Sequence, residues 1–387
     1  MSQDDGESCR IVALPARLAT GNTPYVRLLH DGLRAGGCIV DDWRPMRLRQ
    51  TADILHVHWP EAVFWNRLAM LHGRGARFAA DRLLATAARV RARGGAVIWT
   101  IHDLWPHDGV APSRLPTWEG FFPALLAQLD AVISLTRTGL REAQLVYPSL
   151  LRLPSLTAPH PHFRDVLPAP PPRAVARRAL GLPDDAVVMC SLGQVRPYKG
   201  ILPLIQAFAA ARTGAVLIVA GNCQDRVLAR QLREAADAAG PSVRLDLRVL
   251  SDEEMIRIYA AADMAVFNFG SILNSGSVLT ALSLDRPVIA PALGSLVEVG
   301  EAVGPDWMRL VERVTPEVLR AGVAWLRGVR RPPRPKLAAF DPAEIVRLHV
   351  DFFRAVLAQR ARPVGVRTGQ GVAPFESAPG AARWDSR

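Results

Sequence analysis

The chain has 387 residues, of which 49% are hydrophobic and 21% are charged, a composition that excludes a disordered protein. Its net charge of +11 comes from arginines spread along the whole chain, with neither interleaved aromatic residues nor a recognisable finger or helix-turn-helix pattern, which argues against a nucleic-acid partner. No apolar run reaches the ~18 residues that span a bilayer, and the polar, acidic N-terminus does not resemble a signal peptide, so we expect a cytoplasmic protein.

Short apolar segments alternate with helical patterns in both halves of the chain. The expected strands cover residues 10–14, 38–41, 54–58, 96–102 and 131–135, then 187–192, 215–220, 245–250, 264–267 and 287–290. Strands that alternate with helices form parallel sheets, so each half is predicted to be a doubly wound, Rossmann-like α/β domain. We expect the two domains to face a central cleft, because ligands of such sheets bind at the carboxyl ends of the strands.

Proline and glycine mark the expected boundaries. Residues 148–183 contain nine prolines and are predicted to be a linker with little regular structure. The predicted organisation is an N-terminal domain over 1–165, a C-terminal domain over 175–335, a C-terminal helix over 336–362 and a disordered tail over 363–387.

Polar loops follow three expected strands of the first half, at residues 20–25, 56–61 and 100–108. Alternation along a strand places His56 and His58 on one face, close to carboxylates such as Glu61. This pattern favours acid–base chemistry or acceptor binding, with structural histidines as the alternative. A metal site is less favoured, because neither a His-x-x-x-His nor an Asp-x-Asp run occurs.

The segment from Phe64 to Arg93 interleaves apolar residues with seven arginines. A basic amphipathic helix of this kind can lie on anionic lipid. An ordinary surface helix with solvated arginines gives the same pattern, and the sequence leaves both interpretations open.

One turn concentrates positive charge in the second half. Gly193 follows the expected strand 187–192, and Arg196 and Lys199 precede a helical pattern; Lys199 is one of only two lysines in the chain. Two cations beside a helix N-terminus can hold a diphosphate, whereas the simpler interpretation is a solvated basic turn.

A second loop in the same half carries small polar residues. It precedes an apolar helix, where serine or asparagine can cap the helix and glycine allows a ligand to approach the backbone. Together with Asn222 and Glu298, it predicts a donor-binding site for phosphate and ribose, formed by Gly193, Arg196, Lys199, Asn222, Asn274, Ser275, Gly276, Ser277 and Glu298.

Five pieces of the chain resemble the xanthan-type GDP-mannose:glycolipid 4-β-D-mannosyltransferases, which are glycosyltransferases of the GT-B fold. The resemblance covers about residues 10 to 360. The pieces are Pro24-Tyr25 with Leu28-Leu29, His58-Trp-Pro-Glu61, His102-x-Leu-x-Pro-His107 with an acid at 108, Arg196-Pro-Tyr-Lys-Gly200, and Asn274-Ser-Gly276 continuing to Arg286-Pro-Val.

The resemblance implies transfer of mannose from GDP-mannose, with inversion and without a metal or other cofactor, onto a polyprenyl-diphosphate-linked oligosaccharide in exopolysaccharide synthesis. It implies a peripheral position at the inner face of the cell membrane, whose anionic surface would suit the charge of the chain. Asp108 or Glu61 would be the base, and Arg196 with Lys199 would hold the leaving diphosphate. The implied acceptor-binding residues are Asn22, Tyr25, His58, Trp59, His102 and His107.

The chain departs from the family pattern on the acceptor side. Asp103 stands where the family usually has Asn, and Thr23 separates Asn22 from Pro24. Retaining GT-B enzymes often carry a pair of glutamates where this chain has Ile272 and Thr280. The alternatives are a UDP-sugar transferase, a sugar-nucleotide epimerase or phosphorylase with the same diphosphate site, and a non-enzymatic binding protein.

Overall fold

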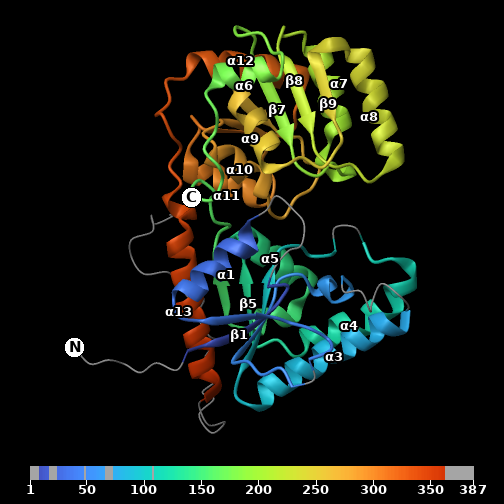
Figure 1. Ribbon diagram of the computed structural model, residues 1–387, viewed down its shortest axis with the longest axis vertical. Helices are drawn as coiled ribbons and strands as arrows, with labels where there is room; N and C mark the ends of the chain where they lie inside the picture. Colours follow the sequence, from blue (N-terminus) through green and yellow to red (C-terminus); the bar gives the residue numbers. More distant parts are fainter. Residues whose placement is uncertain (1–7, 17–23, 48, 66–72, 107–108, 362–387) are drawn as a thin grey trace, which may run out of the picture. The chain divides into compact units, whose positions relative to one another are not determined.

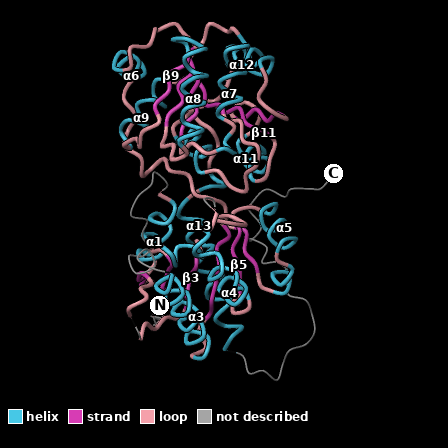
Figure 2. Tube along the Cα trace, turned by 90° about the vertical axis from the view of Figure 1, so that its right-hand side faces the viewer, coloured by secondary structure: helices cyan, strands magenta, loops and turns pink. Residues whose placement is uncertain are grey.

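The computed structural model describes residues 8–16, 24–47, 49–65, 73–106 and 109–361. The chain divides into two compact units, residues 1–161 with 340–387 (unit 1) and residues 162–339 (unit 2). Each unit has a six-stranded parallel sheet with helices on its faces (Figures 1 and 2). The prediction of two doubly wound α/β domains is confirmed.

The sheet of unit 1 has the strand order β2-β1-β3-β4-β5-β6. Its strands are β1 (Arg10–Leu14), β2 (Ile39–Asp42), β3 (Ile54–Val57), β4 (Ala96–Ile101), β5 (Ala131–Ser134) and β6 (Ser155–Thr157). The helices are α1 (Tyr25–Ala35), α3 (Gly73–Ala92), α4 (Leu115–Leu126), α5 (Arg137–Val146) and α13 (Pro342–Ala361), with 3-10 turns η1 (Pro60–Phe64), η2 (Pro112–Arg114) and η3 (Pro148–Arg152).

The core of unit 1 depends on helices from both ends of the chain. Buried residues recur along one side of α1, at Tyr25, Leu29 and Leu33. This side shares a hydrophobic cluster with Phe352 and Phe353 of α13. A side-chain carbon at Gly32 would lie 2.4 Å from Val346 Cγ2, so α1 and α13 are in close contact.

The sheet of unit 2 has the strand order β12-β11-β10-β7-β8-β9. Its strands are β7 (Val188–Leu192), β8 (Val216–Ala220), β9 (Val243–Asp246), β10 (Met264–Val266), β11 (Val288–Pro291) and β12 (Met308–Val311). The helices are α6 (Arg173–Ala179), α7 (Ile201–Ala211), α8 (Arg226–Ala239), α9 (Asp252–Ala261), α10 (Gly276–Ser283), α11 (Ser295–Val303) and α12 (Pro316–Gly328), with 3-10 turns η4 (Pro197–Lys199) and η5 (Gly240–Ser242). A last turn, η6 (Ala338–Phe340), contains the boundary between the two units.

A buried arginine anchors α6 to the sheet of unit 2. Arg177 has no exposed side-chain surface and pairs with Asp263 at 2.7 Å. Its guanidinium also donates to the carbonyls of Ala261, Pro183, Asp184 and Ala186. The Asp263 carboxylate also accepts a hydrogen bond from the amide of Val188 on β7.

Three details of the sequence prediction are corrected by the structure. The segment 148–183 contains β6 and α6, although it was predicted to have little regular structure. The strand expected at 245–250 is β9, which lies earlier because Arg244 pairs with Ile218 of β8. A further strand, β12, was not predicted.

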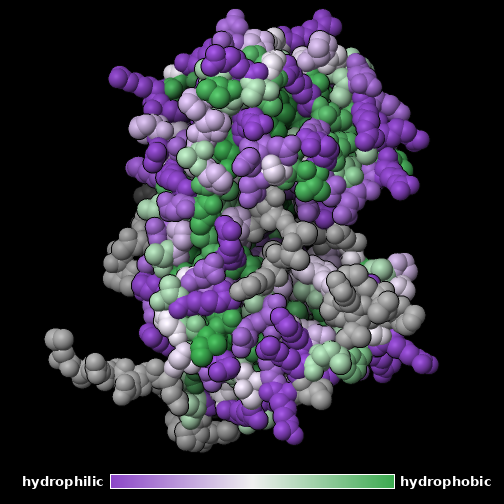
Figure 3. Space-filling model, viewed as in Figure 1, coloured by the Kyte–Doolittle hydropathy of each residue, from purple (hydrophilic) through white to green (hydrophobic). Residues whose placement is uncertain are grey.

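The predicted C-terminal helix 336–362 corresponds to α13, which belongs to unit 1 rather than to a separate element. The predicted tail 363–387 lies outside the described residues. Within the described parts of the chain, no helix is both long and apolar enough to cross a membrane. Hydrophilic residues cover the outer side of α8, where Arg230, Arg233 and Glu234 are exposed (Figure 3).

Candidate active site

The strand order of unit 2 indicates where a ligand site is expected. The chain runs from β7 outward through β8 to β9, then crosses back to β10 on the other side of β7. The strand order therefore reverses between β7 and β10, and in open parallel sheets ligands bind at the carboxyl ends of the strands beside this point. The basic turn follows β7, and the Asn274–Ser277 loop follows β10.

Two glycines allow these two loops to pack closely against each other. Gly193 has φ 127°, and a side-chain carbon there would lie 2.7 Å from Ser277 Oγ. Gly200 has φ 61°, and a side-chain carbon there would lie 2.0 Å from the carbonyl oxygen of Asn268. Only glycine combines these backbone angles with such close approach. Asn268 Nδ2 in turn donates to the Gly200 carbonyl at 3.2 Å, which fixes the end of the basic turn.

The two cations of the turn are held differently. Arg196 donates from Nε and Nη2 to Gln194 Oε1, at 3.2 and 2.9 Å. Lys199 Nζ lies 4.7 Å from the ring centre of Phe269 and 5.5 Å from that of Tyr198. An aromatic face attracts an ammonium group and restricts where it can point. Both cations are half-buried, so a bound anion would meet them only partly screened by water.

The loop after β10 presents the N-terminus of α10. Ser275 caps this helix, because its Oγ accepts from the amide of Val278 at 3.3 Å. Asn274, Gly276 and Ser277 are half-buried around the cap. The amides of a first turn carry partial positive charge, so this end of α10 adds to the field of the basic turn.

Asn222 lies in the loop after β8, and Glu298 lies in the helix that follows β11. The carbonyl of Asn222 accepts from the amide of Val195 at 2.8 Å, joining the loop after β8 to the basic turn. Glu298 is half-buried in the first turn of α11. That helix is tied to the β10 loop through a hydrogen bond of 3.2 Å from the Ser295 amide to the Leu273 carbonyl. Hydrogen bonds and close glycine contacts thus join all four loops that carry the predicted donor residues.

The predicted acceptor residues of unit 1 are mostly enclosed. Tyr25, His58 and His102 are 1%, 0% and 7% exposed. Trp59 is half-buried and stacks on His102, with ring centres 4.1 Å apart. Trp59 is therefore the better placed of these side chains to touch a ligand, with His102 as its support. Asn22, His107 and Asp108 lie outside the described residues.

A shallow pocket of about 10 Å³, too small to enclose a sugar, lies beside Trp59 in unit 1. Its wall includes Glu61 of η1 together with Asp103 and Trp105. Trp105 is 50% exposed, so an aromatic face is available at the edge of the pocket. Aromatic faces and carboxylates are groups that can stack on and hydrogen-bond a sugar. Glu61 is thus the candidate base whose surroundings the structure describes.

Sequence reasoning missed two residues that support the predicted donor-binding loops, Asn268 and Phe269. Asn268 bonds the basic turn, and Phe269 supports Lys199. A signal for them exists in the sequence: Asn268 is a single polar residue between two phenylalanines at the end of an expected strand. That pattern marks a strand end where a polar group turns toward a neighbouring loop.

The part of unit 2 that contains the basic turn and the Asn274–Ser277 loop matches a known family. Residues 186–326 match the family described as "Glycosyl transferases group 1". The chain also shares its fold with solved structures: sucrose-phosphate synthase from Thermosynechococcus elongatus (18% identity, TM-score 0.58, 91% of this chain and 97% of that one) and Anabaena HepE in complex with UDP-glucose (12% identity, TM-score 0.60, 91% and 99%). The protein is a glycosyltransferase of the GT-B fold.

Among curated relatives, the chain is 29% identical over 331 residues to the GDP-mannose:glycolipid 4-beta-D-mannosyltransferase of Xanthomonas campestris pv. campestris. This alignment covers 84% of this chain and 86% of the relative. It is 31% identical over 185 residues to the D-inositol 3-phosphate glycosyltransferase of Salinispora arenicola, covering 41% of this chain and 40% of that protein. The similarity to the mannosyltransferase thus extends over both units, as the sequence resemblance predicted.

Proposed function

We propose that the protein transfers mannose from GDP-mannose, with inversion, onto a lipid-linked saccharide in exopolysaccharide synthesis. The observation that carries the proposal is the similarity to the Xanthomonas mannosyltransferase, which extends over 84% of the chain. The donor end of the proposal is supported by Arg196 and Lys199, which follow β7 beside the point where the strand order reverses.

The proposed donor site divides the nucleotide sugar among the four loops. Lys199 and Arg196 pair with the diphosphate, and the capped N-terminus of α10 supplies backbone amides to it. Glu298 accepts hydrogen bonds from the ribose diol. Charge builds up on the diphosphate as the sugar leaves, so cations fixed in advance stabilise the transition state more than the ground state.

The proposed base is a carboxylate of unit 1. Inversion needs one group to remove the proton from the attacking hydroxyl, and Glu61 lies on the wall of the pocket beside Trp59. Asp108 is the second candidate. Replacing the true base by its amide, in Glu61→Gln or Asp108→Asn, would lower kcat by about 100- to 10,000-fold and leave donor binding intact.

A membrane surface is the proposed location of the acceptor. In α3 the exposed side includes Arg74 and Arg77 with Phe78, whereas residues such as Ala76 and Leu83 are buried against the unit. Exposed arginines beside an aromatic residue suit an anionic lipid surface. In sedimentation with phosphatidylglycerol vesicles, the wild type should pellet with the vesicles and an Arg74→Ser/Arg77→Ser double variant should stay in the supernatant. If equal fractions of both proteins pellet, α3 does not bind the membrane through these arginines.

The first experiment is a thermal-shift panel with GDP-mannose, GDP, UDP-glucose, UDP-glucuronate and UDP. GDP ligands should raise the Tm of the wild type, and the rise should be lost in Lys199→Ala but kept in Lys336→Ala, the matched variant of the other lysine. A response to UDP ligands alone would retain the donor site and refute the mannosyl assignment. Silence from every nucleotide would refute the donor site itself.

A further inference from the structure

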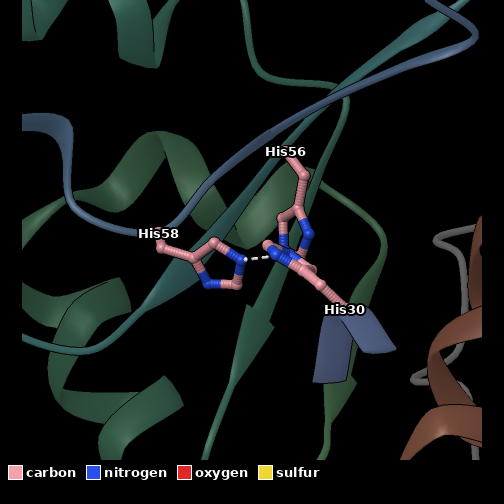
Figure 4. Close-up of side chains that lie close together, drawn as sticks. All are labelled: His30, His56 and His58. Atoms are coloured by element: carbon pink, nitrogen blue, oxygen red, sulfur yellow. Dashed lines mark hydrogen bonds between the residues drawn. The ribbon is translucent and has the colours of Figure 1, made fainter. Parts of the chain in front are cut away.

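Three histidines converge in the interior of unit 1, at the point where its strand order reverses between β1 and β3. His30 comes from α1, and His56 and His58 come from β3 and the residue that follows it (Figure 4). All three are 0% exposed. One ring nitrogen from each lies within 4.8 Å of the other two. The resemblance implies an acceptor-binding role for His58, but its side chain is enclosed, and the proposed base and donor-binding groups are other residues.

We propose that His30, His56 and His58 bind a divalent transition-metal ion of the Zn²⁺ class. Imidazole nitrogen is a preferred ligand of zinc, at about 2.0–2.1 Å, and two such ligands of one tetrahedral ion are a little over 3 Å apart. His30 Nε2 and His58 Nε2 are 3.1 Å apart, which is close to that spacing. The group contains no carboxylate among the described residues, which disfavours Mg²⁺ and Ca²⁺.

The remaining ring nitrogens of His30 and His58 have the outer partners expected of metal ligands. His30 Nδ1 lies 3.0 Å from the carbonyl of Ala16, to which it donates. His58 Nδ1 lies 3.2 Å from His102 Nε2. Such outer contacts fix the orientation of an imidazole and leave its other nitrogen to face the ion. In both residues the other nitrogen is Nε2. The two Nε2 atoms are hydrogen-bonded to each other at 3.1 Å (Figure 4), a contact that a shared ion would replace.

His56 completes the group and is incompletely satisfied without an ion. Its Nε2 lies 2.7 Å from Thr100 Oγ1, and among the described residues its buried Nδ1 has no hydrogen-bond partner. Hydrogen bonds therefore do not account for all the nitrogens of the cluster. A buried polar atom left unsatisfied costs about 1–3 kcal/mol, a cost that coordination of an ion by Nδ1 would remove.

The protonation state of the cluster suits a cation. Burial lowers the pKa of His30 to about 4 and the pKa values of His56 and His58 well below the ordinary 6.5. The three imidazoles are therefore neutral at pH 7 with lone pairs available, and a metal ion binds the neutral form. An enclosed ion would link α1 to β3, so its expected role is structural. The inference does not depend on the identity of the donor or acceptor.

The test uses the full-length protein, stripped with a chelator and then titrated with Co²⁺ or Zn²⁺. We expect one ion per chain, visible absorption of tetrahedral Co²⁺, and a rise in Tm. In ¹⁵N-detected NMR of the wild type, one nitrogen of each of the three histidines should move to the shift of a metal ligand. No uptake by folded wild type, or uptake without movement of these three signals, would overturn the proposal.

Variants localise the ion. His56→Gln should bind Co²⁺ more than about 100-fold more weakly, because loss of even an outer partner typically costs 10- to 100-fold. His160→Gln is the matched control: this buried histidine lies in the same unit but outside the group, so its uptake should equal that of wild type. Equal uptake by folded His56→Gln would refute the site. If His56→Gln does not fold, the NMR result on the wild type decides.

Discussion

The two units carry different side chains at the point where the strand order of each sheet reverses. Both sheets are parallel and both reverse their strand order once, between β1 and β3 in unit 1 and between β7 and β10 in unit 2. In unit 2 this point carries half-buried cations and a capped helix end, whereas in unit 1 it carries histidines closed off from water. One topology thus brings half-buried cations to a helix end in unit 2, and encloses a group of imidazoles in unit 1.

The largest expected effect of this contrast is acid sensitivity confined to unit 1. Burial lowers the pKa of His160 and of His349 to about 4. The unfolded chain takes up these protons near pH 6.5, so stability is full above that pH and falls toward pH 4, by about 3 kcal/mol for each histidine. Unit 2 has His162 as its only histidine, so it should be much less affected.

Hydrogen exchange of the full chain at pH 7 and pH 5, corrected for intrinsic rates, measures this difference. Peptides of β3 and α13 should lose protection at the lower pH while peptides of β7 and β8 keep theirs. Uniform loss over both units would contradict the assignment of the acid response to buried histidines.

The next largest effect concerns the ion pair of unit 2. Arg177→Met should destabilise unit 2 by about 3–5 kcal/mol, because it leaves the Asp263 carboxylate and several carbonyls without their buried donor. Arg173 also pairs with Asp263, at 3.0 Å, but is 47% exposed. Arg173→Met should therefore cost less than about 1 kcal/mol. Urea unfolding of the two variants makes the comparison, and similar midpoints would show that burial is not what makes Arg177 important.

The glycine that locks the basic turn gives a smaller effect. Gly200→Ala should cost about 2–3 kcal/mol, from a strained backbone and from contact with the Asn268 carbonyl. Gly214 also has positive φ, 70°, but a side-chain carbon there would meet nothing within 4 Å. Gly214→Ala should cost only about 1 kcal/mol and preserve nucleotide binding. Equal losses in Tm would mean that the tight contact at Gly200 does not hold the turn.

The smallest effect separates helix capping from ligand binding. Ser275 and Thr315 cap α10 and α12 with equal distances, 3.3 Å, to the capped amides. Ser275→Ala and Thr315→Ala should each lower stability by about 1 kcal/mol. Only Ser275→Ala should also weaken the binding of nucleoside diphosphate, measured by calorimetry. Equal binding in both variants would remove the N-terminus of α10 from the donor site.

The sequence predicts most of this fold because its central strands are continuous apolar runs. It fails at the edges. The strand β6 lies inside the proline-rich segment and has one buried residue, and β12 contains an arginine and is buried only at Met308, so neither is a continuous apolar run. At β9 the apolar residues extend to Val249, which is 70% exposed, so pairing with β8 and not hydrophobicity sets where that strand lies.

The donor loops follow from local sequence, whereas the histidines of unit 1 do not. Glycines next to cations at a strand end specify the basic turn without reference to distant residues. The burial of His56 depends on α13, almost 300 residues later in the chain, whose Phe353 ring lies 5.4 Å from the His56 ring. No local pattern around His56 indicates that contact, so the sequence alone could not predict whether these histidines are exposed in a loop or buried together.

The return of α13 to unit 1 also has a consequence for biosynthesis. A ribosome makes the strands of unit 1 first, but Phe352 and Phe353, which close their core, are among the last residues of that unit to emerge. Unit 2 is contiguous in sequence, so it can fold before α13 has been synthesised and has packed on the sheet of unit 1. A premature stop codon before α13 would thus leave unit 2 able to fold but would remove the helix that completes the core of unit 1. The apolar face of unit 1 would then be exposed to chaperones and proteases.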